Sequence, residues 1–301
     1  MNSKYRKLLR YSLITFAVAL LGFFVISYNI LHFRIEDNNY LAKLNDNPFG
    51  LKADVSYYTH NGRRVRYVEI GRDSLPLIVF VHGAPSSSSF WEDMLRDSTL
   101  LSRAKLLAVD RPGYGFSGYG KPELSLKKQA KIISPILKKK RKEHPAIVLH
   151  GSSYGGTLVA RLAMDYPNLI DGILLQSASV APGEEKTYWI TYPTSHWSLK
   201  WLVPPALQIA NAEKLSHKIQ LDSMASLWHR IKSKAIILHG DNDALIYPKN
   251  AYFAKEKMVN ASIVDFRMLP GRGHDLLWTK RELLIESLLK LLSIEQKNKT
   301  H

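Results

Sequence analysis

Residues 146–166 read AIVLHGSSYGGTLVARLAMDY and decide the fold. Residues 146–150 are a continuous apolar run, which is typical of a strand covered on both faces of a parallel sheet. Residues 156–166 have the spacing of a helix. Between them, only Ser153 has a glycine two positions before it and another two positions after it. A nucleophile on a tight strand-to-helix turn needs small neighbours, so this pattern predicts that Ser153 is a nucleophile.

The competing interpretation of this turn is a glycine-rich loop that holds a phosphate at a helix N-terminus. The turn around Ser153 contains no G-x-G-x-x-G, and the sequence contains no G-x-x-x-x-G-K-[ST] pattern. The strand, turn and helix around Ser153 therefore favour a hydrolase over a nucleotide-binding protein.

Further apolar and β-branched runs predict an α/β fold, a mostly parallel sheet with helices on both faces. The first two runs flank Asn61-Gly62 and are expected to form a hairpin. No strand pattern occurs between Ser177 and Arg230, and this stretch is rich in aromatic residues and proline, as expected of a lid. The predicted strands are 55–59, 64–70, 77–81, 105–109, 146–150, 172–175, 235–239 and 263–268, and the predicted helices are 125–143, 156–166, 251–257 and 279–293.

A serine nucleophile requires a base and an acid, and both residue types follow later strands. Asp243 comes after the run at 235–239, and His274 comes after the run at 263–268. The chain order serine, aspartate, histidine is the one that such a sheet requires. Asp241 is the competing acid, and either aspartate alone is also a common turn residue.

An oxyanion site requires two backbone N–H groups. One is expected from Tyr154, the residue after the nucleophile, and the other from Ala84, because the following Pro85 has no N–H to donate. Three other histidines lie within or beside strand runs and are interpreted as packing residues bonded to backbone: His82, His150 and His239.

Together these motifs resemble the α/β-hydrolase superfamily, over about residues 55–293. The resemblance implies an eight-stranded sheet, with Ser153 as nucleophile, His274 as base and Asp243 as the acid that orients it, while Asp110 is expected to be structural. Proline iminopeptidases show HGGPG where this chain has HGAPS, and epoxide hydrolases use an aspartate where it has Ser153. The motifs are HGAPSSSSFW (82–91), DRPGYGFSG (110–118), GSSYGG (151–156), HGDNDALIYP (239–248) and GRGH (271–274).

The predicted activity is hydrolysis of a carboxylic ester, with an acyl or lipid-like substrate, through an acyl-enzyme. The lid aromatics, among them Trp189, Trp197 and Trp201, suggest either an apolar entrance or packing of the lid onto the core. An aminopeptidase or amidase and a carbon–carbon bond hydrolase would use the same triad. A non-catalytic, membrane-tethered binding protein on the same scaffold is the alternative from another class.

Residues 11–33 carry no formal charge and follow a basic N-terminal segment. As a helix these 23 residues would reach ~34 Å, enough to cross a ~30 Å hydrocarbon core. The only Ala-x-Ala in this N-terminal region, at residues 17–19, lies inside the apolar stretch, which favours an uncleaved anchor over a cleaved signal peptide. The bases before the span place the N-terminus in the cytoplasm and the catalytic domain on the periplasmic or extracytoplasmic side.

The expected organisation has five parts. They are a basic tail and transmembrane anchor (1–33), a linker (34–54), a first part of the hydrolase core (55–176), a lid insertion (177–230), and a second part of the core with a tail (231–301).

The composition limits the remaining function classes. With 46% hydrophobic and 23% charged residues, the 301-residue chain is expected to fold around a packed core. The absence of cysteine excludes a disulfide scaffold, a cysteine zinc site and a thiol nucleophile, and no metal or cofactor is expected. Most of the net charge of +16 lies before the span and in residues 121–143. The sequence shows no nucleic-acid-binding motif, so no nucleic-acid partner is expected. Nothing in the sequence indicates an oligomeric state.

Overall fold

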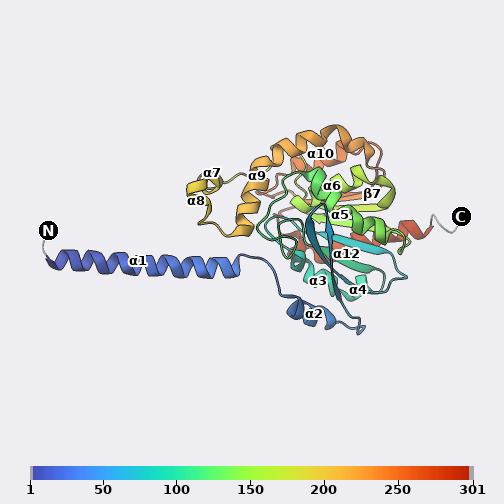
Figure 1. Cartoon of the computed structure of the whole chain (residues 1–301). Coiled ribbons are helices and arrows are strands. Elements are labelled where there is room, and N and C mark those ends of the chain that lie inside the picture. Colours follow the sequence, from blue (N-terminus) through green and yellow to red (C-terminus); the bar gives the residue numbers. More distant parts are fainter. Residues whose placement is uncertain (1–2, 298–301) are drawn as a thin grey trace.

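All eight predicted strands occur and form one sheet in the order β1-β2-β4-β3-β5-β6-β7-β8 (Figure 1). The computed structural model describes the backbone of residues 3–297 and the side chains of residues 4–293. β2 pairs antiparallel with β1 and with β4, whereas the strands from β4 to β8 run parallel, so the predicted fold class is confirmed. The strands are β1 (Asp54–His60), β2 (Arg63–Ile70), β3 (Leu77–Val81), β4 (Lys105–Val109), β5 (Ile147–Ser152), β6 (Gly172–Gln176), β7 (Lys234–Gly240) and β8 (Ser262–Leu269).

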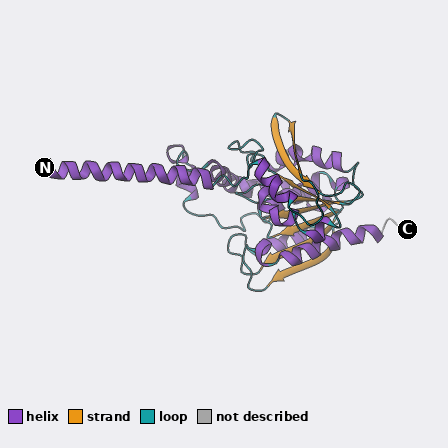
Figure 2. Cartoon of the chain, turned by 90° about the horizontal axis from the view of Figure 1, so that it is seen from below, coloured by secondary structure: helices purple, strands orange, loops and turns teal. Residues whose placement is uncertain are grey.

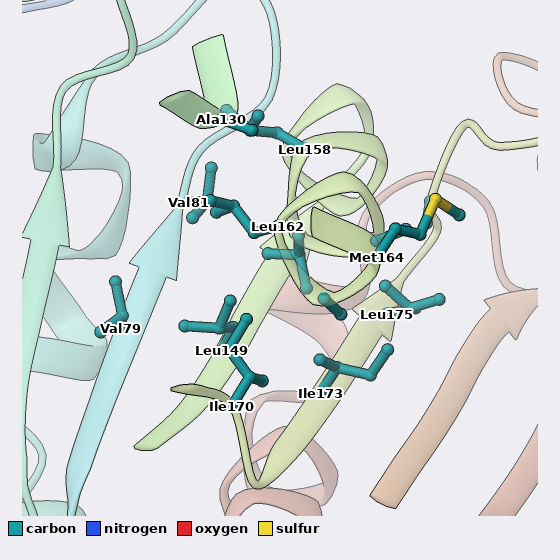
Figure 3. Close-up of a cluster of buried hydrophobic side chains, with 14 of the residues drawn as sticks. Val79, Val81, Ala130, Leu149, Leu158, Leu162, Met164, Ile170, Ile173 and Leu175 are labelled. Carbon is teal, nitrogen blue, oxygen red and sulfur yellow. The ribbon is translucent and has the colours of Figure 1, made fainter. Parts of the chain in front are cut away.

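Helices cover both faces of the sheet, because the inner strands are apolar on both sides. On one face, Leu158 and Leu162 of α6 pack over Val81 and Leu149 of the central strands (Figure 3). On the other face, α12 packs across β5, β6 and β7. These helices are α3 (Glu92–Leu95), α4 (Ser98–Leu101), α5 (Leu126–Lys140), α6 (Tyr154–Asp165), α10 (Lys249–Lys257), α11 (Leu276–Thr279) and α12 (Arg281–Lys297), with the 3-10 turns η1 (Ser88–Trp91) and η2 (Pro167–Leu169).

The segment expected to be a linker, residues 34–54, contains a helix, α2 (Asp37–Asn45), that packs against the sheet domain. Tyr40 and Leu44 are fully buried, and the Tyr40 hydroxyl donates a hydrogen bond of 2.9 Å to the carbonyl of Ser88. Asp37 forms an ion pair with the buried Arg66 at 2.8 Å. The polar composition of the segment concealed this docking, because only two apolar side chains of the helix are inserted.

The lid predicted for residues 177–230 is helical. It consists of α7 (Thr191–Ser195), α8 (Trp197–Lys200), the long α9 (Pro205–Met224) and the 3-10 turn η3 (Ala225–Arg230). One isolated bridge, between Glu185 and Ile246, ties the start of this segment to the loop after β7. The lid therefore lies over the edge of the sheet where the parallel strands end.

The N-terminal helix α1 (Ser3–Ile30) extends away from the sheet domain in both views (Figures 1 and 2). Residues 4–30 are long and apolar enough to cross a membrane, and the most apolar part of this helix is not buried in the protein. A core helix of a soluble protein would be covered by its neighbours, whereas α1 leaves its apolar side chains exposed.

Candidate active site

The turn between β5 and α6 holds Ser153 in a conformation that few residues adopt. Its φ is +55°, in the left-handed region that disfavours a side chain. The flanking glycines make room for this turn. A Cβ on Gly155 would lie 2.1 Å from the Val81 carbonyl oxygen, and one on Gly151 would lie 2.5 Å from the Gly155 carbonyl oxygen. The two glycines that singled out Ser153 in the sequence are therefore required by the close passage of β3, β5 and α6.

His274 and Asp243 are brought together from the loops after β8 and β7. His274 Nδ1 lies 2.7 Å from Asp243 Oδ2. The other carboxylate oxygen, Oδ1, accepts hydrogen bonds from the backbone N–H groups of Leu245 and Ile246 at 3.0 and 2.9 Å. Burial acts to raise the pKa of Asp243, but His274 and the two N–H donors outweigh it and lower that pKa. Asp243 is thus held as a carboxylate and oriented toward the imidazole.

The competing acid, Asp241, lies in a different environment. It is exposed, and its Oδ1 accepts a hydrogen bond of 2.7 Å from the backbone N–H of Gly271. This contact joins the loops after β7 and β8, so the role of Asp241 is to stabilise these loops. Its carboxylate makes no hydrogen bond with His274 in the part of the chain that the structure describes.

The three strand histidines are buried, as their interpretation as packing residues requires. His239 Nε2 bonds the Ile246 carbonyl at 2.9 Å, and His82 Nδ1 bonds the Gly83 carbonyl at 2.8 Å. His150 differs from the expectation of a backbone partner, because its Nε2 lies 2.9 Å from the side-chain oxygen of Gln176. Burial lowers the pKa of His150 to about 3, so this ring is neutral.

Ser153 and His274 line one cavity together with Ala84 and Tyr154, the two residues predicted to donate backbone N–H groups. The loop that carries Ala84 runs beside the serine, since a Cβ on Gly83 would lie 3.1 Å from Ser153 Cβ. Tyr154 is the first residue of α6, and the N–H of a first helical residue has no partner inside its helix. The four predicted residues therefore share one space, and both N–H groups belong to backbone beside the serine.

A buried ion pair that the sequence did not indicate joins the lid to this loop. Arg111 donates to Glu213 of α9 at 2.7 and 3.1 Å, and both side chains are at most 1% exposed. Arg111 also donates to the carbonyl groups of His82 and Gly83, at 2.9 and 3.1 Å. The Tyr114 hydroxyl donates a further hydrogen bond of 2.8 Å to Glu213. One arginine thus connects the lid helix with the backbone that presents Ala84.

The lid also places polar groups on the cavity wall that no motif in the sequence indicates. Lys214 Nζ lies 3.2 Å from Glu185, which accepts a hydrogen bond of 2.7 Å from the Ser179 hydroxyl. His217 Nε2 lies 3.0 Å from the same hydroxyl. Burial lowers the pKa of His217, although Glu185 opposes the shift. Ser179 and Glu185 lie far before Lys214 and His217 in the chain, and the position of α9 brings the two pairs together.

Breaking the Arg111–Glu213 pair is expected to destabilise the fold. Glu213→Leu leaves a buried guanidinium without a partner, and we expect the free energy of unfolding to fall by about 3–5 kcal/mol. Adding Arg111→Met should recover part of this loss, because both charges are then removed. Urea unfolding of the detergent-solubilised chain, followed by circular dichroism, measures the three variants.

The exposed pair Lys218–Asp222 on the same helix is the matched control. Asp222→Leu is expected to cost at most about 1 kcal/mol, since exposed ion pairs contribute little. Equal losses for Glu213→Leu and Asp222→Leu would contradict the role given to the buried pair.

Comparisons with known proteins agree with this architecture. Residues 78–286 match the sequence profile of the alpha/beta hydrolase family. An uncharacterized hydrolase of Saccharomyces cerevisiae is 28% identical over 155 residues, which cover 48% of this chain and 51% of the yeast protein. The chain spans about half or less of the length of the first curated relatives that it matches.

Two solved structures share the fold. A bacterial membrane phospholipase A superposes with a TM-score of 0.64 and 16% identity, over 97% of this chain and 99% of that one. A serine hydrolase from Cycloclasticus zankles superposes with a TM-score of 0.59 and 19% identity, over 81% of this chain and 98% of that one. With the family profile matching more than half of its residues, the chain belongs to the alpha/beta hydrolase family.

Proposed function

We propose that this protein is a membrane-anchored serine hydrolase that cleaves carboxylic esters. One observation carries the proposal: Asp243 holds His274 by a 2.7 Å hydrogen bond, and His274 lines the same cavity as Ser153. Ala84 and Tyr154 line that cavity as well. A nucleophile, a base with an orienting acid, and two candidate oxyanion donors are the set that acyl transfer requires.

In the proposed mechanism, Ser153 Oγ attacks the ester carbonyl while His274 accepts its proton. The negative charge on the carbonyl oxygen is stabilised by the N–H groups of Ala84 and Tyr154. His274 then gives the proton to the leaving alcohol, and an acyl-enzyme remains on Ser153. His274 then takes a proton from water, whose oxygen attacks the acyl carbonyl; the bond between Ser153 Oγ and the acyl group breaks, the carboxylic acid leaves, and His274 returns the proton to Oγ. Asp243 keeps the imidazole in the tautomer that both steps need.

The cavity wall supports an ester with an apolar acyl group. Its apolar lining consists of Ala84, Pro85, Leu207, Ala210, Leu245 and Ile246. Glu185, Lys214 and His217 form a polar part of the same wall, suited to the alcohol portion of a substrate. The membrane phospholipase A and the serine hydrolase among the structural neighbours are compatible with such a substrate.

The proposal includes the membrane. Helix α1 is apolar and exposed along its length, and the basic residues Lys4, Arg6, Lys7 and Arg10 lie at its start. A span with clustered bases on one side keeps that side in the cytoplasm. The sheet domain and its cavity then lie on the periplasmic or extracytoplasmic side.

Ser153→Ala is expected to abolish the activity. The variant lacks the attacking oxygen, so hydrolysis of p-nitrophenyl butyrate should fall by at least about 10³-fold and labelling by a fluorophosphonate should disappear. Retained labelling of the variant would refute Ser153 as nucleophile. Comparing the wild type on an ester, an aminoacyl amide and a β-diketone separates an esterase from a peptidase or a carbon–carbon bond hydrolase.

The two aspartates provide a paired test of the acid. Asp243→Asn removes the charge that orients His274, and we expect kcat to fall by about 10³–10⁴-fold. Asp241→Asn should change kcat by less than about threefold, because that carboxylate bonds only a turn N–H. The same p-nitrophenyl assay measures both variants, and a larger loss for Asp241→Asn would transfer the role to that residue.

The absence of native cysteine allows a clean test of membrane topology. Single cysteines are introduced by Ser3→Cys before the span and by Ser74→Cys at an exposed site of the sheet domain. A membrane-impermeant maleimide applied to spheroplasts should label Ser74→Cys, and it should label Ser3→Cys only after lysis. The reverse pattern would show that the domain lies in the cytoplasm.

A further inference from the structure

Three tryptophans at the end of the lid are almost uncovered by protein. Trp189, Trp197 and Trp201 are 77, 80 and 71% exposed. None of them lines the catalytic cavity, which is reached instead by Tyr188 and Thr191 from the same segment. These indoles are therefore not packed onto the core, and whether they border an apolar entrance stays a prediction. A cluster of exposed aromatic side chains within one short segment, residues 189–201, indicates an interaction site.

This cluster lies beside the helix proposed to cross the membrane. Figure 1 shows α7 and α8 projecting from the sheet domain on the side where α1 leaves it. The Trp201 ring stacks on Phe24 of α1 with their centroids 6.3 Å apart. A groove between the two segments is lined by Leu21 and Val25 of α1 and by Val203 of the lid, among others.

The contact with α1 sets the depth of the lid tip. Phe24 lies six residues before the end of α1 at Ile30, which corresponds to ~9 Å along a helix. If α1 spans the bilayer, Trp201 is at the level of the extracytoplasmic leaflet rather than in the water beyond it. Tryptophan is enriched at this interface, because its ring is apolar and its N–H is polar.

The charge of the lid segment suits the same position. Between Glu185 and Glu213 the sequence contains no acidic residue, and Lys186 and Lys200 are its only Lys or Arg residues. Acidic side chains would be repelled by anionic headgroups, whereas lysines are attracted to them. The segment thus carries no acidic residue and two lysines, of which Lys200 lies within the tip between Trp197 and Trp201.

We infer that the lid tip, residues 188–203, inserts into the extracytoplasmic leaflet of the bilayer that α1 crosses, and that the enzyme takes its ester from that leaflet. The inference rests on the proposed function for its anchor and its chemistry. Tyr188 and Thr191 line the cavity while the adjacent Trp189 and Tyr192 are exposed. One short segment therefore borders both the cavity and the surface assigned to the membrane. The substrate class that follows is a lipid-like ester held in the bilayer.

Tryptophan fluorescence reports this insertion without any reference to activity. Helix α1 contains no tryptophan, so quenching by lipid can come only from the remainder of the chain. The full chain is reconstituted in phosphatidylcholine nanodiscs with and without bromine on the acyl chains. We expect brominated lipid to quench the wild type, and the triple variant Trp189→Phe, Trp197→Phe, Trp201→Phe to lose this quenching.

Two results would overturn the insertion. An unquenched wild type would show that the tryptophans lie in water. Quenching that persists in the triple phenylalanine variant would place another part of the domain, such as the exposed Trp278, in the membrane instead.

A second measurement compares two esters with the same chromophore. p-Nitrophenyl butyrate reaches the cavity from water, whereas p-nitrophenyl palmitate is dissolved in the nanodisc. The triple variant Trp189→Ser, Trp197→Ser, Trp201→Ser should lose about tenfold or more in kcat/KM on the palmitate, because the polar tip no longer favours the interface. Its activity on the butyrate should stay unchanged, and the phenylalanine variant, which keeps the apolar area, should retain both.

The outcomes separate the two proposals. If the triple tryptophan-to-serine variant hydrolyses the palmitate as fast as the wild type, entry from the bilayer is refuted. A wild type that is quenched in nanodiscs but hydrolyses neither ester would refute the proposed esterase function and leave the lid insertion supported.

Discussion

The passage of α6 beside β3 at the end of β5 is the constraint on which the other parts depend. Two glycines allow backbone to approach backbone at distances that no Cβ would permit, and Ser153 between them takes a left-handed conformation. This turn puts the serine and the first helical N–H of α6 at the same point. The loop after β3 is brought beside it by the same close packing, so Gly83 and Ala84 lie next to the serine.

Buried polar contacts of Asp110 and Arg111 hold the loops around the serine turn in position. Asp110 accepts hydrogen bonds from the backbone of Ser88 and Phe116 and pairs with Arg66, which in turn reaches α2. Its neighbour Arg111 supports the loop that carries Ala84 and binds the lid. The short DRPGYG motif is therefore structural in this chain, and it ties three separate segments to the sheet.

The fold could be predicted because its signals are local. Each strand is a run of apolar or β-branched residues, and the serine turn needs only two glycines at fixed spacing. The assignments of Ser153, Asp243 and His274 stay predictions, but each residue lies where the end of a strand was expected to place it. Glu213 and His217 could not be found in this way, because their roles depend on how α9 crosses the sheet. The docking of α2 was missed for a similar reason, since two buried side chains in a polar segment leave no periodic pattern.

The Arg111–Glu213 pair also decides which part of the lid is free to move. Lifting α9 from the sheet would separate two buried charges and leave the Arg111 guanidinium and the Tyr114 hydroxyl without Glu213 as their acceptor. The free energy that this separation would cost holds α9 in place. The pair does not hold residues 187–204, where α7 and α8 are short and join α9 through Pro204-Pro205. The lid thus consists of a long helix that a buried ion pair fixes to the core and a tip of two short helices that this pair does not hold.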